Sequence, residues 1–201
     1  MAVILLVAKG EAGARDARII NSQSHVGGQA YLVSFQVEGA FTPDLEEAIR
    51  SGVPTSFTYY FRIFRDVPGW RPDERVFEFQ VRRTVHYDNI RQTYTILMGE
   101  KGSTVTVKSL EAAREKMTVF KDMPVAMVSA LPSEDPYYLS VKAEMERVQF
   151  PFPFGMDFVF FFTSLWDFQT KWTRIELKPA TPLPPEPPRP ATPVPTEVGA
   201  P

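Results

Sequence analysis

The stretch FTYYFRIF at residues 57–64 decides the fold, because apolar and polar side chains alternate along it. The same alternation returns in FEFQVRRTVHY at residues 77–87 and in TYTILM at residues 93–98. A period of two places successive side chains on opposite faces of a sheet. A sheet with one apolar and one polar face is usually antiparallel. These runs therefore predict neighbouring strands of an antiparallel sheet.

Further strands and two short helices surround these runs. Strands are expected at residues 18–24, 29–38, 104–108, 125–131 and 137–149. Thr42-Pro43-Asp44 begins one helix, which Gly52 ends, and Ser109 caps the other. Many short strands with few helices predict a mainly β (β-rich α+β) fold, either an antiparallel β-sandwich or a strongly twisted sheet with two short connecting helices.

The chain divides into residues 1–14, a single β-rich domain at 15–178, and a proline-rich tail at 179–201. The apolar run AVILLVA at residues 2–8, followed by Ala12-Gly13-Ala14, is typical of the end of a secretory signal peptide. The other interpretation is a first β-strand. A signal predicts a periplasmic or otherwise exported protein, tethered to the membrane through an N-terminal segment if the native start lies upstream.

The tail is expected to be disordered and extended, because proline lacks the backbone N–H and fixes φ. It acts as a spacer in one interpretation and as a docking motif around residues 187–190 in the other.

Composition removes several classes of function. The 201 residues include no cysteine and carry a net charge of −2, so neither thiolate chemistry nor recruitment of nucleic acid by charge is expected. His25 and His86 have no metal-ligand spacing, and the sequence contains neither a nucleophile elbow nor a phosphate-binding loop. No catalytic, cofactor or metal residue is assigned, and the protein is predicted not to be an enzyme. A hydrolase would be the least surprising exception.

A segment rich in phenylalanine at residues 150–168 has two interpretations. It covers one end of the core, or it forms a surface for a protein partner or an apolar ligand. The residues of such a surface are Phe158, Phe160, Phe161, Phe162 and Trp166.

A second group of residues is predicted to form a structural polar cluster. Its members are Trp70, Asp73, Glu74, Arg83, Tyr87 and Tyr94. Arg83 belongs to the side of its strand that faces the apolar core, so a buried, hydrogen-bonded arginine is expected there.

Several segments in this order resemble the family called domain of unknown function 4390. The matching segments are residues 45–54, 69–74, 83–88, 91–94, 150–152 and 166–172. The resemblance runs from about Asp16 to Leu177. It implies an exported proteobacterial protein without known catalytic residues, in an envelope or signalling context.

Two functions remain open. One is an envelope-associated domain that binds a protein partner, such as a membrane sensor kinase. The other is a carrier or sensor of an apolar ligand or lipid, with a cavity lined by phenylalanine.

Overall fold

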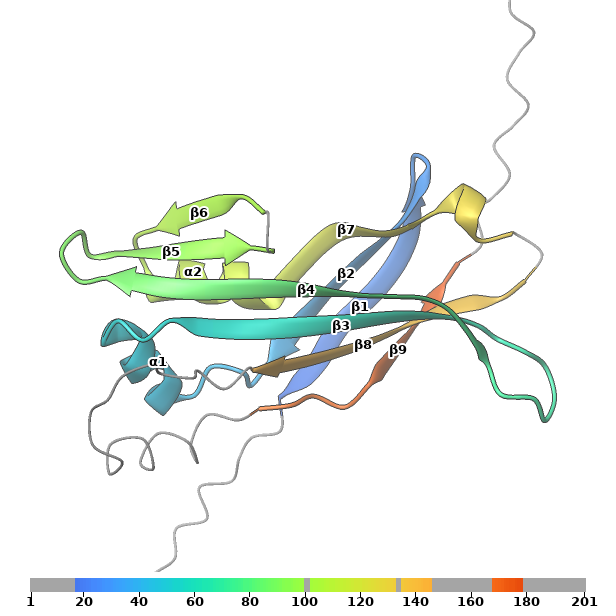
Figure 1. The fold of residues 1–201 in the computed structure, drawn as a ribbon, viewed down its shortest axis with the longest axis horizontal. Coiled ribbons are helices and arrows are strands. Elements are labelled where there is room, and N and C mark those ends of the chain that lie inside the picture. Colours follow the sequence, from blue (N-terminus) through green and yellow to red (C-terminus); the bar gives the residue numbers. More distant parts are fainter. Residues whose placement is uncertain (1–16, 100–101, 133–134, 146–167, 179–201) are drawn as a thin grey trace, which may run out of the picture.

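The computed structural model describes residues 17–99, 102–132, 135–145 and 168–178, which form two antiparallel sheets (Figure 1). The smaller sheet has the order β1-β2-β7, and the larger has the order β6-β5-β4-β3-β8-β9. The strands are β1 (Arg18–Gly27), β2 (Ala30–Glu38), β3 (Thr55–Arg65), β4 (Glu74–Asp88), β5 (Thr93–Met98), β6 (Thr104–Val107), β7 (Val119–Met127), β8 (Tyr137–Met145) and β9 (Thr173–Leu177). The predicted mainly β class, with antiparallel strands and two short helices, is confirmed, and of the two predicted arrangements the strands form two sheets.

The alternating residues of β3 face the space between the sheets. Phe57, Tyr59, Phe61 and Ile63 are fully buried there. The facing strand β2 buries its own alternate residues, which are Tyr31, Val33, Phe35 and Val37. Two apolar faces that turn toward each other form the core, since both remove their side chains from water.

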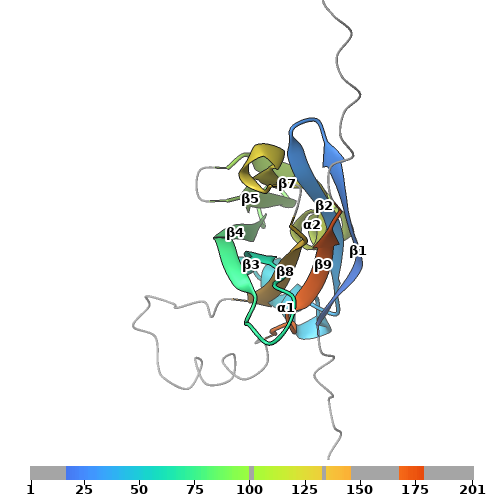
Figure 2. The ribbon, with the colours of Figure 1, turned by 90° about the vertical axis from the view of Figure 1, so that its right-hand side faces the viewer.

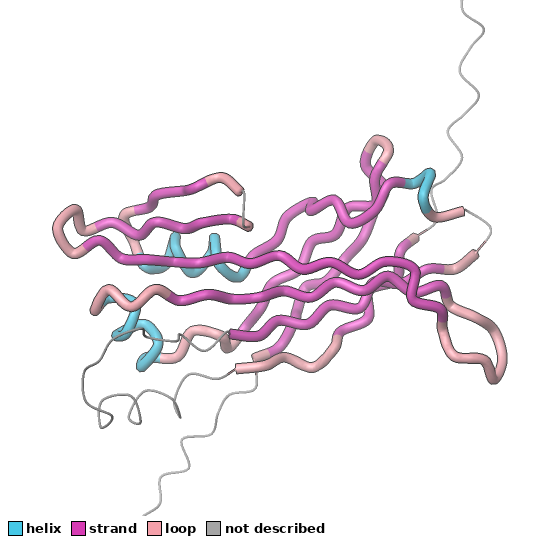
Figure 3. The backbone as a smooth tube through the Cα atoms, in the orientation of Figure 1, coloured by secondary structure: helices cyan, strands magenta, loops and turns pink. Residues whose placement is uncertain are grey.

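Two short helices cover one end of the sheets (Figure 3). Helix α1 (Pro43–Arg50) begins at Thr42, whose side-chain oxygen accepts a hydrogen bond from the Leu45 amide at 3.3 Å. Helix α2 (Leu110–Thr118) begins at Ser109, whose side chain accepts from the Ala112 amide at 3.1 Å. Both N-caps are those that the sequence predicts.

Phe120 of β7 links the two sheets through its aromatic ring. The ring stacks on Phe35 of β2 at 4.5 Å between centroids and meets the edge of Tyr59 of β3 at 4.6 Å. Aromatic pairs of this kind contribute beyond the burial of their area.

Arg83 of β4 reaches into the same region. Its guanidinium lies 3.5 Å from the centroid of Phe120 and donates hydrogen bonds to the carbonyl oxygens of Lys116 at 2.7 Å and Val119 at 2.9 Å. These carbonyls belong to the end of α2 and the start of β7, where a helix leaves backbone oxygens without intrahelical partners. Burial lowers the pKa of Arg83.

The structure corrects two expected boundaries. β7 begins at Val119, directly after α2, and ends at Met127, where a short 3-10 helix (Val128–Ala130) follows in place of the predicted strand at 125–131. The expected boundary is wrong because Lys121 and Asp122 interrupt the apolar pattern, and Asp122 has a φ of 48°, where the pairing with β2 is irregular. β1 likewise continues through His25, and the turn falls at Gly28, whose φ is 61°.

Several sequence predictions lie outside the described residues. These are the segment at 1–14, the tail at 179–201 and all of the segment at 150–168 except Phe168. Phe168 packs edge-on against Phe57 at 4.8 Å.

We expect Arg83→Met to destabilise the domain by about 2 kcal/mol, because it removes two hydrogen bonds from a charged donor to backbone carbonyls while keeping an apolar stem. Urea denaturation with the wild type as reference measures this. Arg71→Met, on an exposed loop, serves as the control and should change the free energy of unfolding by less than about 0.5 kcal/mol. An equal effect of both substitutions would contradict the role given to Arg83.

Candidate functional site

One half of β4 has an open edge. β3 pairs along β4 from Glu74 to Val85, whereas β5 pairs with β4 only from Arg83 to Asp88. Among the described residues, no strand pairs with the outer edge of residues 77–81. Figure 1 shows β5 alongside only one half of β4, and Figure 2 shows β4 between β5 and β3 in the larger sheet. Backbone groups on such an edge can pair with another strand.

Backbone direction identifies the groups that face outward. The carbonyl of Arg82 accepts a hydrogen bond from the Gly99 amide at 2.6 Å, so it points toward the β5 side. Because backbone groups alternate along an antiparallel strand, the N–H and C=O of Glu78 and Gln80 point the same way. The register with β3 is continuous from Phe77 to Val85, so this alternation holds along the open edge.

The outer strands of the smaller sheet differ from this edge. β1 is irregular between Ile20 and Gln23, where Asn21 has a φ of 53°. β7 is irregular near Asp122 and contains Pro124. Bulges and proline are features that keep an edge from pairing with other chains. Residues 77–81 lack both features, so they form a regular and available edge.

The open edge has an apolar rim. Phe77, Phe79 and Val81 point toward the inner side of the sheet, since they pair with Ile63, Phe61 and Tyr59. Phe79 stacks on Phe61 at 4.8 Å, but Phe77 is 42% exposed. An incoming strand would therefore extend both the backbone ladder and the apolar face.

The loop before β4 presents a tryptophan. Trp70 is 91% exposed and follows Gly69, whose φ of 101° is readily accessible only to glycine. Exposed tryptophan is common among the residues that contribute most to protein–protein binding.

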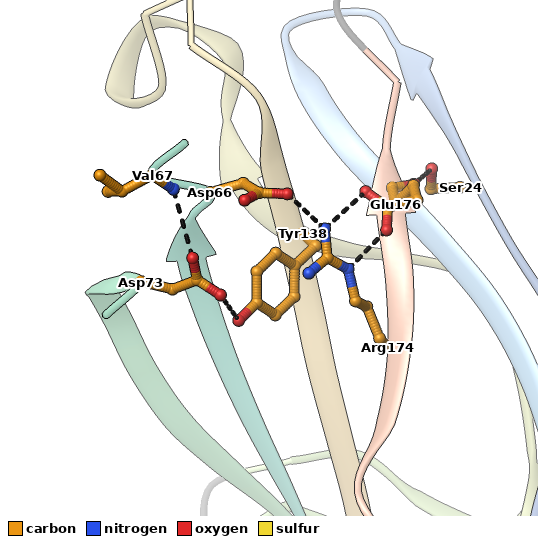
Figure 4. A network of polar contacts seen from close by, with 7 residues as sticks. All are labelled: Ser24, Asp66, Val67, Asp73, Tyr138, Arg174 and Glu176. Atoms are coloured by element: carbon orange, nitrogen blue, oxygen red, sulfur yellow. Dashed lines mark hydrogen bonds and ion pairs between the residues drawn. The ribbon is translucent and has the colours of Figure 1, made fainter. Parts of the chain in front are cut away.

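Polar contacts hold the base of this loop. The Asp73 carboxylate accepts hydrogen bonds from the Tyr138 hydroxyl at 2.7 Å and from the Val67 amide at 3.2 Å (Figure 4). The bond from Tyr138, followed by that from Val67, lowers the pKa of Asp73. Partial burial and the same bond raise the pKa of Tyr138 to about 12. The carboxylate is thus charged and the phenol protonated at neutral pH.

Arg174 extends the network to β9. Its guanidinium lies 3.7 Å from the centroid of the Tyr138 ring and bonds to Asp66 at 2.6 Å and Glu176 at 2.5 Å (Figure 4). The bonds to Glu176 and Asp66 raise the pKa of Arg174. The Ser24 hydroxyl of β1 donates to the Glu176 carbonyl, which joins this network to the smaller sheet. The network therefore ties both ends of the Trp70 loop to the sheets behind it.

The structure divides the predicted polar cluster into three places. Trp70, Asp73 and Glu74 lie at the loop, and Arg83 is partly buried beside the end of α2. Tyr87 and Tyr94 form an aromatic pair between β4 and β5, with ring centroids 4.6 Å apart. The predicted surface of Phe158, Phe160, Phe161, Phe162 and Trp166 lies outside the described residues.

The two histidines occupy different elements. His25 on β1 lies 3.7 Å from Asp122, and His86 is exposed on β4. In the described part of the chain, no group of three or more His, Cys, Asp or Glu side chains is arranged to hold a metal ion. No helix among the described residues is long and apolar enough to cross a membrane.

The residues of the open edge, Phe77 to Val81, were not singled out by sequence reasoning. One signal could have found them, because the run at 77–87 is much longer than the run at 93–98 with which it pairs. A long strand beside a short one leaves part of its edge unpaired.

We expect Tyr138→Phe to raise the pKa of Asp73 toward its ordinary value, because the variant loses only the hydroxyl donor. A carboxyl ¹³C NMR titration measures this pKa. A carboxyl group whose pKa is lowered by folding stabilises the protein at pH values above its ordinary pKa of about 3.9. This stabilisation is lost as the pH falls through the folded-state pKa. The stability difference between wild type and variant should therefore be present at neutral pH and disappear in acid.

Tyr60→Phe is the matched control, since the Tyr60 hydroxyl bonds to Glu144 at 2.6 Å and not to Asp73. It should leave the pKa of Asp73 unchanged. An unchanged Asp73 in Tyr138→Phe would show that the hydroxyl does not set its charge.

Comparisons with known proteins place the chain in a family. The model of the domain of unknown function DUF4390 matches residues 14–176. Neither the comparison with curated proteins nor that with solved structures gave a match. Because the match covers most of the 201 residues, the chain belongs to the DUF4390 family, whose function is unknown.

Proposed function

We propose that this domain is a protein-binding module that adds an extended segment of its partner to the open edge of β4. The observation that carries the proposal is the regular, unpaired edge at residues 77–81 beside the partly exposed Phe77. In strand addition, backbone hydrogen bonds provide affinity and alternate side chains provide specificity.

The side chains of the edge supply such a pattern. The inner side offers Phe77, Phe79 and Val81, and the outer side offers Glu78 and Gln80. A partner strand should therefore alternate apolar residues with charged or amide residues. This requirement for an alternating strand favours a protein over a small apolar ligand.

The Trp70 loop provides a second contact next to the edge. Residue 73 ends the loop and Glu74 begins β4, so the two features are continuous in the chain. The network of Asp73, Tyr138 and Arg174 holds the base of the loop in place before binding. Preorganisation of this kind reduces the entropy lost on association.

The sequence supports an exported location for this module. The apolar run at residues 2–8 and Ala12-Gly13-Ala14 are typical of a signal peptide. An exported location would make an envelope protein the natural class of partner.

A photo-reactive residue in place of Gln80 tests the proposal in cells. We expect it to form a covalent adduct with a protein partner, because the side chain at this position lies exposed on the outer face of the sheet, directly beside the open edge. The same residue in place of Gln23, an exposed glutamine on β1, is the matched control and should form no such adduct.

A proline at the edge shows whether capture depends on strand addition. For this test the photo-reactive residue is moved to position 70, in the loop beside the edge, where it should also capture the partner. Gln80→Pro should abolish this adduct, because it removes an outward N–H without removing a bond to β3. Circular dichroism checks that the variant folds. A folded Gln80→Pro variant with undiminished capture would refute strand addition.

A further inference from the structure

We propose that the strand that pairs with this edge is residues 77–81 of a second copy of the chain. This inference rests on the proposed function, because it names the partner of the same edge. Two copies of β4 would pair antiparallel about a twofold axis at Phe79 and join their larger sheets into one.

The side chains are self-complementary in this register. Phe79 lies opposite Phe79 of the second copy, and Phe77 lies opposite its Val81, so apolar residues meet on the inner side. On the outer side Glu78 lies opposite Gln80, which can donate a hydrogen bond to the carboxylate. Directly opposed residues of this kind are the unit of sheet stabilisation.

The backbone geometry fits the same register. The outward N–H and C=O groups belong to Glu78 and Gln80, as the bond from the Gly99 amide to the Arg82 carbonyl indicates. Two opposed residues whose backbone N–H and C=O groups both point outward exchange two hydrogen bonds. The Phe79 pair at the axis exchanges none, because its backbone groups point toward β3. With Phe79 at the axis, each Glu78 faces a Gln80, and the available groups all find partners.

Both ends of the joint have a structural limit. At one end, Arg83 is already paired with Met98 of β5. At the other end, Val76 has no partner on β3, because Ile63 pairs with Phe77 and Phe64 pairs with Arg75. In the proposed register, this bulge lies beside the end of β5 of the second copy. A bulge bends its strand away from the ladder, so the joint ends there.

Charge on the outer side also fits a second copy. Glu78 lies 2.7 Å from Arg62 and 2.8 Å from Arg75 of its own chain. These two partly exposed ion pairs reduce, without removing, the repulsion between the two Glu78 side chains, which lie diagonal to each other across the joint. Arg82 of the second copy lies on the opposite diagonal of Glu78 and adds attraction.

Two substitutions at one position test this register. Gln80→Lys places an ammonium opposite Glu78 at both symmetric positions, so the dimer should tighten roughly fivefold. Gln80→Glu places like charges there and should weaken the dimer by a similar factor. Sedimentation equilibrium of the whole protein, from micromolar to millimolar concentration, measures both dissociation constants.

Gln23→Lys and Gln23→Glu are the matched controls on β1 and should leave dimerisation unchanged. Equal association of both Gln80 variants would overturn the register. A monomer at every concentration would overturn the second copy as partner. The proposed function is then tested separately by the photo-reactive residue at position 80. Capture of a different protein would support it, and capture of no protein would contradict it. A second copy is recognised because its adduct has twice the mass of one chain.

Discussion

The contacts of the partly buried Arg83 guanidinium are the interaction on which the arrangement of the two sheets depends. It binds carbonyl oxygens at the end of α2 and at the start of β7, and it stacks on Phe120. Phe120 in turn contacts Phe35 of the smaller sheet and Tyr59 of the larger. One side chain thus fixes where the chain leaves α2, enters β7 and crosses from one sheet to the other. A planar guanidinium suits this task, because one of its nitrogens donates to both carbonyl oxygens while the group lies over the Phe120 ring.

This arrangement explains why one half of β4 has an open edge. Arg83 and α2 lie at the half of β4 that pairs with β5, and both helices cover that end of the sheets (Figure 3). The other half extends past the end of β5, where Phe77 remains partly exposed. Since β4 runs on beside β3 to the Trp70 loop, the edge and the loop lie on the same side of the molecule. The constraint that organises the core therefore also determines which strand is left to bind.

The alternation of apolar and polar residues was sufficient to predict the side chains of the core, but it was not sufficient to predict the candidate site. Runs such as residues 57–64 predict which side chains turn inward, because a period of two depends only on local geometry. The predicted polar cluster depends instead on distances between residues. Glu74 and Arg83 lie on one strand nine positions apart, and at about 3.3 Å per residue they are separated by roughly 30 Å. No pattern in one sequence shows that Asp73 meets Tyr138, because this contact is set by the register between strands. The length of the run at 77–87 relative to its neighbour was a readable signal of an unpaired edge.

An edge that accepts a strand must also be kept from accepting strands without limit. Open edges pair readily, and a joint that does not close on itself produces fibres. A joint about a twofold axis at Phe79 consumes the regular edge of both copies. The outer strands of the smaller sheet are bulged at Asn21 and Asp122, so they offer no equivalent edge for a third copy. Glu78 and Arg82 on the outer side further restrict which sequences fit beside β4. In the proposed dimer, the regular edge of β4 and the bulges of β1 and β7 therefore favour a closed pair over continued strand addition at these edges.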